Sequence, residues 1–155
     1  MRVIRTVALL GGVAVFLIGA QTVGAAGGGA AAVNPATLVL EVTGLRSVEG
    51  LLHYAVYDRA ETFPTRKGRV TYDDPKITDK TMTIRVPSLK PGTYAIAIFH
   101  DENANDEFDQ GLFGIPLEDY AFSNNASGFF SAPSFEAASF KLAAPETRIV
   151  IRIDE

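Results

Sequence analysis

Alternation of hydrophobic and polar residues dominates the chain after residue 36 and predicts a domain built from β-strands. Successive side chains of a strand point to opposite faces, so a period of two residues indicates a half-buried strand. The most apolar run, 93–99, predicts a central strand. A single helical turn is predicted for 135–138. The remaining predicted strands are 37–42, 50–57, a short edge strand at 68–72, 81–86, 140–142 and 147–153.

Short strands separated by turns predict an all-β fold, an antiparallel Greek-key β-sandwich of about seven strands. Residues 45–50 have the length and the glycine of a hairpin loop between the first two strands. The combination of Pro91 and Gly92 predicts a type II turn with a positive φ at the glycine. The segment 101–136 has no sustained period, so one long irregular loop is expected, and such loops are usually functional or held together by something inside them.

The first 26 residues have the features of a secretory signal peptide. Arg2 and Arg5 form a positive start, an uncharged run follows at 7–20, and small residues precede Ala26. That run is short for a membrane-spanning helix and rich in Gly and Ala, which favours a cleaved signal peptide. An uncleaved N-terminal anchor is the alternative. We therefore expect a signal peptide at 1–26, a flexible linker at 27–35 and a sandwich domain at 36–155. The mature protein is expected to be periplasmic or secreted, without a transmembrane domain.

Composition narrows the chemistry of the chain. It contains no cysteine and two histidines, which excludes disulfides, thiolate metal sites and a zinc site with three histidine ligands. The formal charge is −4, and it becomes more negative by two when Arg2 and Arg5 leave with the leader. An acidic chain repels phosphate backbones, so nucleic acid is not an expected partner.

Oxygen-bearing side chains alternate at the start of the long loop and predict a calcium site. Ca²⁺ takes six to eight hard oxygens, which carboxylates, amides and carbonyls supply. Two features depart from the usual calcium loop, namely Asp106 in place of glycine and Leu112 in place of the last glutamate. A loop of Asx-turns that binds no ion is the alternative. The predicted ligands are Asp101, Asn103, Asn105, the carbonyl of Glu107, Asp109, and Glu118 folding back in place of Leu112.

Catalytic patterns are weak in this sequence. His100 is interpreted as a hydrogen-bonding anchor and His53 as a core or face histidine. Carboxylates at 101, 109, 118 and 119 leave a glycosidase-type pair open, but no nucleophile elbow, P-loop or dinucleotide-binding motif occurs. Aromatic residues of the same segment either pin the loop onto the sandwich or form a glycan-stacking surface. They are Phe113, Tyr120, Phe122, Phe129, Phe130 and Phe135.

Four motifs taken together resemble the DUF2141 family of exported bacterial proteins over residues 36–153. They are the run 89–103, which reads LKPGTYAIAIFHDEN, then GIPLE at 114–118, FSNN at 122–125 and PSFEAASF at 133–140. Family members commonly have a glycine near Asp106. The turn before the central strand also resembles transthyretin-like (prealbumin-like) sandwich modules, which implies a fold and no activity.

The resemblance names no reaction, so the functional expectation comes from the residues. We expect an exported, non-enzymatic binding or envelope-accessory module with a loop stabilised by Ca²⁺. The alternative is a carbohydrate-binding or glycan-hydrolysing module that uses the loop 101–136. The partner is unknown from the sequence, with a glycan or an envelope protein as the candidates.

Overall fold

The computed structural model describes residues 34–129 and 131–153, and its domain is built from two packed β-sheets. The expected signal peptide and most of the expected linker lie outside the described residues. The sheets confirm the all-β sandwich, while its Greek-key and transthyretin-like order stays a prediction. The described strands are β1 (Ala36–Thr43), β2 (Leu51–Tyr57), β3 (Arg69–Asp73), β4 (Met82–Leu89), β5 (Gly92–Asp101), β6 (Tyr120–Phe122), β7 (Phe140–Leu142) and β8 (Glu146–Arg152).

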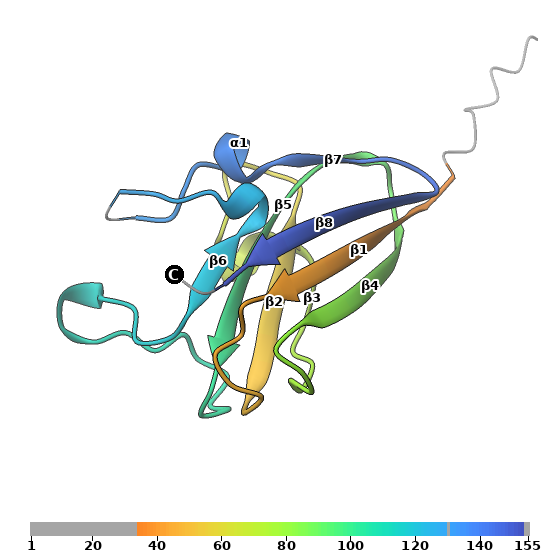
Figure 1. The fold of residues 1–155 in the computed structure, drawn as a ribbon. Helices are drawn as coiled ribbons and strands as arrows, with labels where there is room; N and C mark the ends of the chain where they lie inside the picture. The colour runs from red at the N-terminus through yellow and green to blue at the C-terminus, as the bar shows by residue number, and fades with distance from the viewer. Residues whose placement is uncertain (1–33, 130, 154–155) are drawn as a thin grey trace, which may run out of the picture. The chain divides into compact units, whose positions relative to one another are not determined.

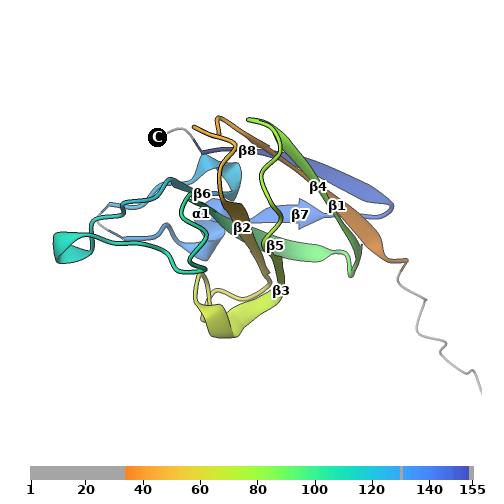
Figure 2. The same ribbon diagram turned by 90° about the horizontal axis from the view of Figure 1, so that it is seen from below.

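Strand order separates the two layers (Figures 1 and 2). One sheet has the order β4-β1-β8, and the other has the order β3-β2-β5-β6, with β7 also pairing with β5. The expectation of purely antiparallel strands was wrong, because β1 and β8 run parallel. The hairpin expected at 45–50 was also wrong, since β1 and β2 belong to different sheets and this segment crosses between them.

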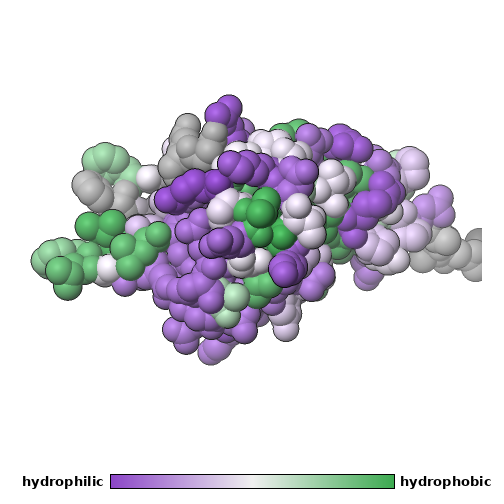
Figure 3. Space-filling model, turned by 60° about the horizontal axis from the view of Figure 1, so that its bottom comes forward, coloured by the Kyte–Doolittle hydropathy of each residue, from purple (hydrophilic) through white to green (hydrophobic). Residues whose placement is uncertain are grey.

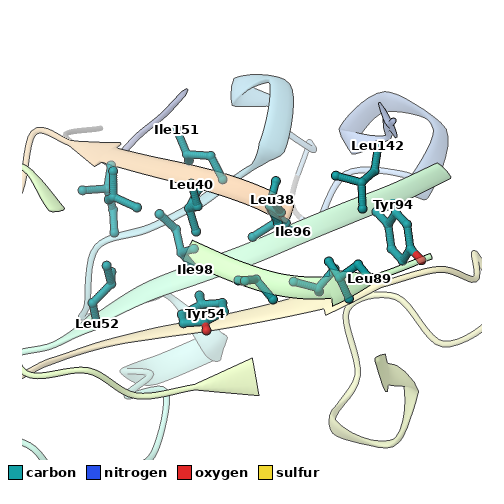
Figure 4. Close-up of a cluster of buried hydrophobic side chains, with 14 of the residues drawn as sticks. Leu38, Leu40, Leu52, Tyr54, Leu89, Tyr94, Ile96, Ile98, Leu142 and Ile151 are labelled. Carbon is teal, nitrogen blue, oxygen red and sulfur yellow. The ribbon is translucent and has the colours of Figure 1, made fainter. Parts of the chain in front are cut away.

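The core lies between the sheets and is filled by alternate residues of the facing strands (Figure 4). Leu38 and Leu40 of β1 meet Leu52 of β2 together with Ile96 and Ile98 of β5. All five side chains are buried. Burial of a Leu or Ile side chain stabilises the fold by about 1.5–3 kcal/mol, so this inner layer supplies much of the stability.

The structure differs from the sequence prediction at the turn before β5 and in the long loop. The positive φ expected at Gly92 is found instead at Ser88, where φ is 64°, and Gly92 begins β5 as extended backbone. The long loop is also less irregular than expected, because it contains the strand β6 and the 3₁₀ turns η2 (Leu112–Gly114) and η3 (Ser123–Asn125). The turn α1 (Phe135–Ala138) was predicted correctly, and the side chain of Ser134 caps its start by accepting the N–H of Ala137. A 3₁₀ turn, η1 (Arg66–Gly68), precedes β3.

Ser123 fixes the second half of the long loop to the central strand. Its hydroxyl accepts the N–H of Ile96 at 2.8 Å and donates to the carbonyl of Ala138, and it is fully buried. Beside it, Asn124 donates to the carbonyl of Ser139 at 2.7 Å. The Ser123 hydroxyl thus replaces a backbone partner of β5 in the gap between β6 and β7, and Asn124 ties the same turn to the segment after α1.

Among the residues that the structure describes, no helix has the length and apolar character needed to cross a bilayer.

Candidate functional site

A cleft of about 730 Å³ opens on the outer face of the β3-β2-β5-β6 sheet. Its floor includes Ala55 of β2 and Ala97 of β5, which face each other in the strand register. Their small side chains leave room between larger neighbours. The volume lies within the range of 300–1,000 Å³ that is typical of sites for small molecules.

Aromatic rings form a continuous row along this cleft. Phe99 contacts Phe108 edge-on with 5.4 Å between the ring centroids, Phe108 contacts Tyr120 at 5.7 Å, and Tyr120 contacts Phe122 at 5.9 Å. Phe63 continues the row beyond Phe122 at 5.7 Å. Edge-to-face pairs of this kind are favourable beyond the area that they bury, so the rings hold one another in place.

The mouth of the cleft is flanked by loop tips that carry exposed apolar side chains. Phe113 lines the cleft and is 98% exposed, and Leu112 beside it is 82% exposed. The loops around η2 and around Phe129 project on the same side of the domain in Figures 1 and 2. The tip on the left of Figure 3 is accordingly largely green. Phe135 packs against a buried cluster that includes Phe122, and Phe122 also lines the cleft. The described aromatic residues of the long segment thus divide between pinning the loop and lining an open surface, and Phe130 lies outside the described residues.

The acidic loop closes through Asx-turns and amide contacts. Asn103 and Asn105 accept the N–H groups of Asn105 and Glu107 at 3.0 and 2.9 Å, as Asx-turns do. Their side-chain amides both donate to Asp109, at 2.7 Å from Asn103 and 3.1 Å from Asn105. The turn expected at Asp106 has a φ of 62°, the left-handed conformation that aspartate tolerates better than most residues.

Most of the predicted calcium ligands lie close together. Asn103 and Asn105 contact Asp109, and Asp101 accepts the N–H of Asn105 at 3.2 Å. Glu118 does fold back, since its carboxylate accepts the N–H of Asp109 at 3.0 Å. The side chain of Glu107 is exposed, and Asp119 instead forms an ion pair with Arg46. Calcium binding by this loop stays a prediction.

The pKa values of the buried Asp101 and the half-buried Glu118 are shifted in opposite directions. Burial alone would raise the pKa of Asp101, but the N–H groups of Asp106 and Asn105, together with His53, hold it below its usual value. Burial raises the pKa of Glu118, and repulsion from the charges of Asp101 and Asp109 raises it further. The hydrogen bond from the N–H of Asp109 lowers this pKa but does not cancel the rise. The surroundings of Asp101 therefore favour its charged form, and those of Glu118 disfavour it.

His53 joins the acidic loop to the end of the cleft, which the sequence did not indicate. Its Nε2 atom lies 3.1 Å from Oδ2 of Asp101, and its Nδ1 atom lies 2.6 Å from Oδ1 of Asp74. The ring stacks on Phe99 with 4.3 Å between centroids. The prediction of a satisfied face histidine was right, but 48 residues separate His53 from Asp101, and no local pattern announces their contact.

His100 and Gly50 anchor the start of the loop. His100 is fully buried and its Nε2 atom lies 2.8 Å from the carbonyl oxygen of Glu49, which confirms the predicted anchor. Gly50 has a φ of 75°, and a Cβ atom there would lie 1.9 Å from the carbonyl oxygen of Asp101. Only glycine therefore allows the 45–50 segment to approach the end of β5 this closely.

Comparison with known protein families gives a match over most of the chain. The family model described as "Uncharacterized protein conserved in bacteria (DUF2141)" matches residues 40–150. The chain belongs to the DUF2141 family. The match spans both sheets, the cleft and the acidic loop, so these features lie within the domain of a DUF2141 protein. No curated protein and no solved structure matches the chain.

Proposed function

We propose that this DUF2141 protein is an exported, non-catalytic binding module and that the cleft on its outer sheet holds a carbohydrate. The observation that carries the proposal is the row of aromatic rings from Phe99 to Phe122 along a cleft of about 730 Å³. Concave sites with apolar walls and a few polar groups are the usual form of a binding site for a small molecule.

The distribution of polar groups favours a sugar over a purely apolar ligand. Arg66, Asp74 and Gln110 line the cleft together with the rings. A pyranose presents flat patches of C–H groups that pack against rings, and its hydroxyls donate and accept hydrogen bonds at the edges. An arginine, a carboxylate and an amide supply both kinds of partner.

Exposure of the rim supports a ligand that spans the mouth of the cleft. Phe113 is 98% exposed, and its neighbours Ile115 and Leu117 are more than half exposed. Contiguous exposed apolar residues on a monomer often mark an interaction site. A glycan chain lying along the rings would cover part of this surface.

The location outside the cytoplasm is part of the proposal and rests on the leader. Arg2, Arg5 and the uncharged run at 7–20 are the features that support export. A mature protein that begins near Ala26, found by intact-mass analysis, would agree with this. A protein that retains Met1 and fractionates with membranes would favour the anchor.

A glycan array followed by calorimetric titration of the selected glycan tests the binding proposal. We expect Tyr120→Ala, which removes a ring that is 42% exposed in the cleft, to weaken binding at least tenfold. Val150→Ala changes an exposed apolar residue of the other sheet and should leave the affinity unchanged. Equal affinities for the two variants, or no binding to any glycan, would contradict the proposal.

Catalysis is tested separately with chromogenic glycosides. The proposal expects no turnover by the purified protein. Turnover that disappears in Asp101→Ala would assign the acidic loop to glycan hydrolysis instead.

A further inference from the structure

We propose that His53, Asp101 and Asp106 form a binding site for a divalent transition metal of the zinc class, with Asp74 orienting the histidine. The ligand atoms come from β2, the end of β5 and the acidic loop, and they all lie within 4.8 Å of one another. The site lies at one end of the cleft, where His53 and Asp74 are also lining residues, and its test does not require a bound carbohydrate.

Hydrogen-bond chemistry at His53 is the first argument. A neutral imidazole has one N–H donor and one acceptor nitrogen. Nδ1 lies 2.6 Å from a carboxylate oxygen of Asp74, and Nε2 makes a hydrogen bond with Asp101 whose direction depends on the tautomer. In the tautomer that carries its proton on Nδ1, the Nε2 lone pair faces the carboxylate of Asp101, 3.1 Å away. The His53 side chain is 11% exposed. A metal ion bound between Nε2 and Asp101 would take the place of the proton that otherwise joins these two atoms.

The contact between Nδ1 of His53 and the carboxylate of Asp74 is of the kind that metal-binding histidines make. Such histidines usually donate their second N–H to a carboxylate, which fixes the tautomer and the direction of the ring. Asp74 fills this role, and the parallel stack on Phe99, with an interplanar angle of 5°, holds the ring plane. The ring is thus oriented before any ion arrives.

Distances between the candidate ligand atoms suit a small ion. With bonds of about 2.1 Å, ligand atoms of a tetrahedral zinc site lie about 3.4 Å apart. The separations from His53 Nε2 are 3.1 Å to Asp101 and 3.9 Å to Asp106, which bracket that value. Three protein ligands leave at least one position for water or another group.

Backbone contacts hold the carboxylate of Asp101 and the main chain of Asp106 in place. Asp101 is fully buried, and its Oδ2 atom accepts the N–H of Asp106 at 2.9 Å. Asp106 adopts a positive φ of 62°, and Arg66 donates to its carbonyl at 2.8 Å, away from the carboxylate. Three carboxylates thus surround one imidazole, and a divalent cation offsets this excess of negative charge.

The nitrogen ligand distinguishes this ion from calcium. Ca²⁺ takes oxygen ligands, whereas imidazole suits zinc, copper, iron and nickel. A calcium ion in the Asx loop would also use Asp101, but its other predicted ligands are Asn103, Asn105, the carbonyl of Glu107, Asp109 and Glu118. The two sites therefore share one residue and differ in all others.

Calorimetric titration of tag-free, chelator-treated protein with ZnCl₂ tests the site, with Co²⁺ absorption as a second readout. We expect one equivalent of Zn²⁺ to bind and Co²⁺ to give a visible band. Asp106→Asn, at a side chain that is 73% exposed, should weaken binding at least tenfold without disturbing the fold. His53→Gln should abolish the Co²⁺ band, which the fully buried ring of His100 should not supply. Glu107→Gln, the neighbouring exposed acid, is the matched control and should bind as the native protein does.

Three results would contradict the proposed metal site. Absence of Zn²⁺ binding by the native protein excludes it, as does binding that Asp106→Asn leaves unchanged. Zn²⁺ that is displaced by millimolar Ca²⁺ and lost in Asp109→Asn would place the cation in the Asx loop instead.

Discussion

The two faces of the β3-β2-β5-β6 sheet are formed by alternate residues of the same strands, but one face is buried as core and the other borders a cleft. On the inner face Leu52, Val56 and Ile96 are fully buried against the opposite sheet. On the outer face Ala55 and Ala97 lie between aromatic rings, and an open cleft remains above them. A period of two residues thus predicts that a face is partly buried, while side-chain size decides whether it becomes core or cleft.

Substitutions on the two faces should therefore have different effects, mainly on stability for the inner face and mainly on ligand binding for the outer face. Large aliphatic side chains that interlock across two sheets lose much contact energy when shortened, because the surrounding residues relax only partly. Residues that border a cleft already face open space, so changes there alter the shape of the site more than the stability of the fold. The predictions below separate these effects, from the largest change in stability to the smallest.

Shortening an inner-face side chain should have the largest effect. Ile96 is fully buried, so Ile96→Ala should lower the free energy of unfolding by about 2–5 kcal/mol. Urea denaturation measures this loss. Val150→Ala, at an exposed residue of β8, should change stability by less than about 0.5 kcal/mol. A loss below 1 kcal/mol in Ile96→Ala would mean that the inner face is not a packed core.

Removal of the Ser123 hydroxyl should have the next largest effect. Ser123→Ala leaves the buried N–H of Ile96 without its partner at 2.8 Å, which costs about 1–3 kcal/mol. Hydrogen exchange should also show faster exchange at the Ile96 amide. Ser127→Ala changes an exposed serine of the same segment and is the control. Equal stability of the two variants would show that the long loop is not fixed through Ser123.

Alkaline pH should weaken the fold through a tyrosine on each face. Burial raises the pKa of Tyr94 on the inner face and of Tyr57 on the outer face above the ordinary value of 10.0. The unfolded chain therefore loses these protons first. Stability is fully present below pH 10.0 and is lost as the pH rises through the folded-state pKa values.

Variants assign this alkaline loss to a face. Tyr57→Phe removes a hydrogen bond to the carbonyl of Pro64 and should cost about 1 kcal/mol at neutral pH, while flattening the alkaline decline. Denaturation in urea between pH 8 and pH 11 measures both effects. A decline of unchanged steepness in Tyr57→Phe would assign the whole effect to Tyr94 and its inner-face neighbours.

Filling the cleft should change stability least and binding most. Ala97→Leu adds an apolar side chain at a half-buried floor position, so the free energy of unfolding should change by less than about 1 kcal/mol. Affinity for the glycan selected on the array should fall at least tenfold. Ala143→Leu, at an exposed alanine outside the cleft, should leave affinity unchanged. Native affinity in Ala97→Leu would place the ligand elsewhere.

Much of the fold could be predicted because it depends on local pattern. The apolar run at 93–99 became the central strand β5, and the turn at 135–138 became α1 with Ser134 as its cap. The crossover at 45–50 could not be predicted as such, since a short loop with a glycine serves a hairpin and a crossover equally well. The choice was made by the partners of β1, which are β4 and β8.

The candidate site divides in the same way. Asp101, Asn103 and Asn105 were identified because their contacts are local, within a loop of a few residues. The contacts of His53 with Asp74 and Asp101 were missed, since each depends on residues far along the chain.

The sequence by itself determined which residues form strands, which loop is acidic and which side chains can accept a cation or stack on a ring. The tertiary structure alone decided which of them meet. His53 pairs with Phe99 in the β2–β5 register, which places it diagonally across from Asp101, and β3 brings Asp74 to its other side. The physical reason is that alternation fixes which face a side chain occupies, whereas strand order and register arise from packing between segments distant in the chain.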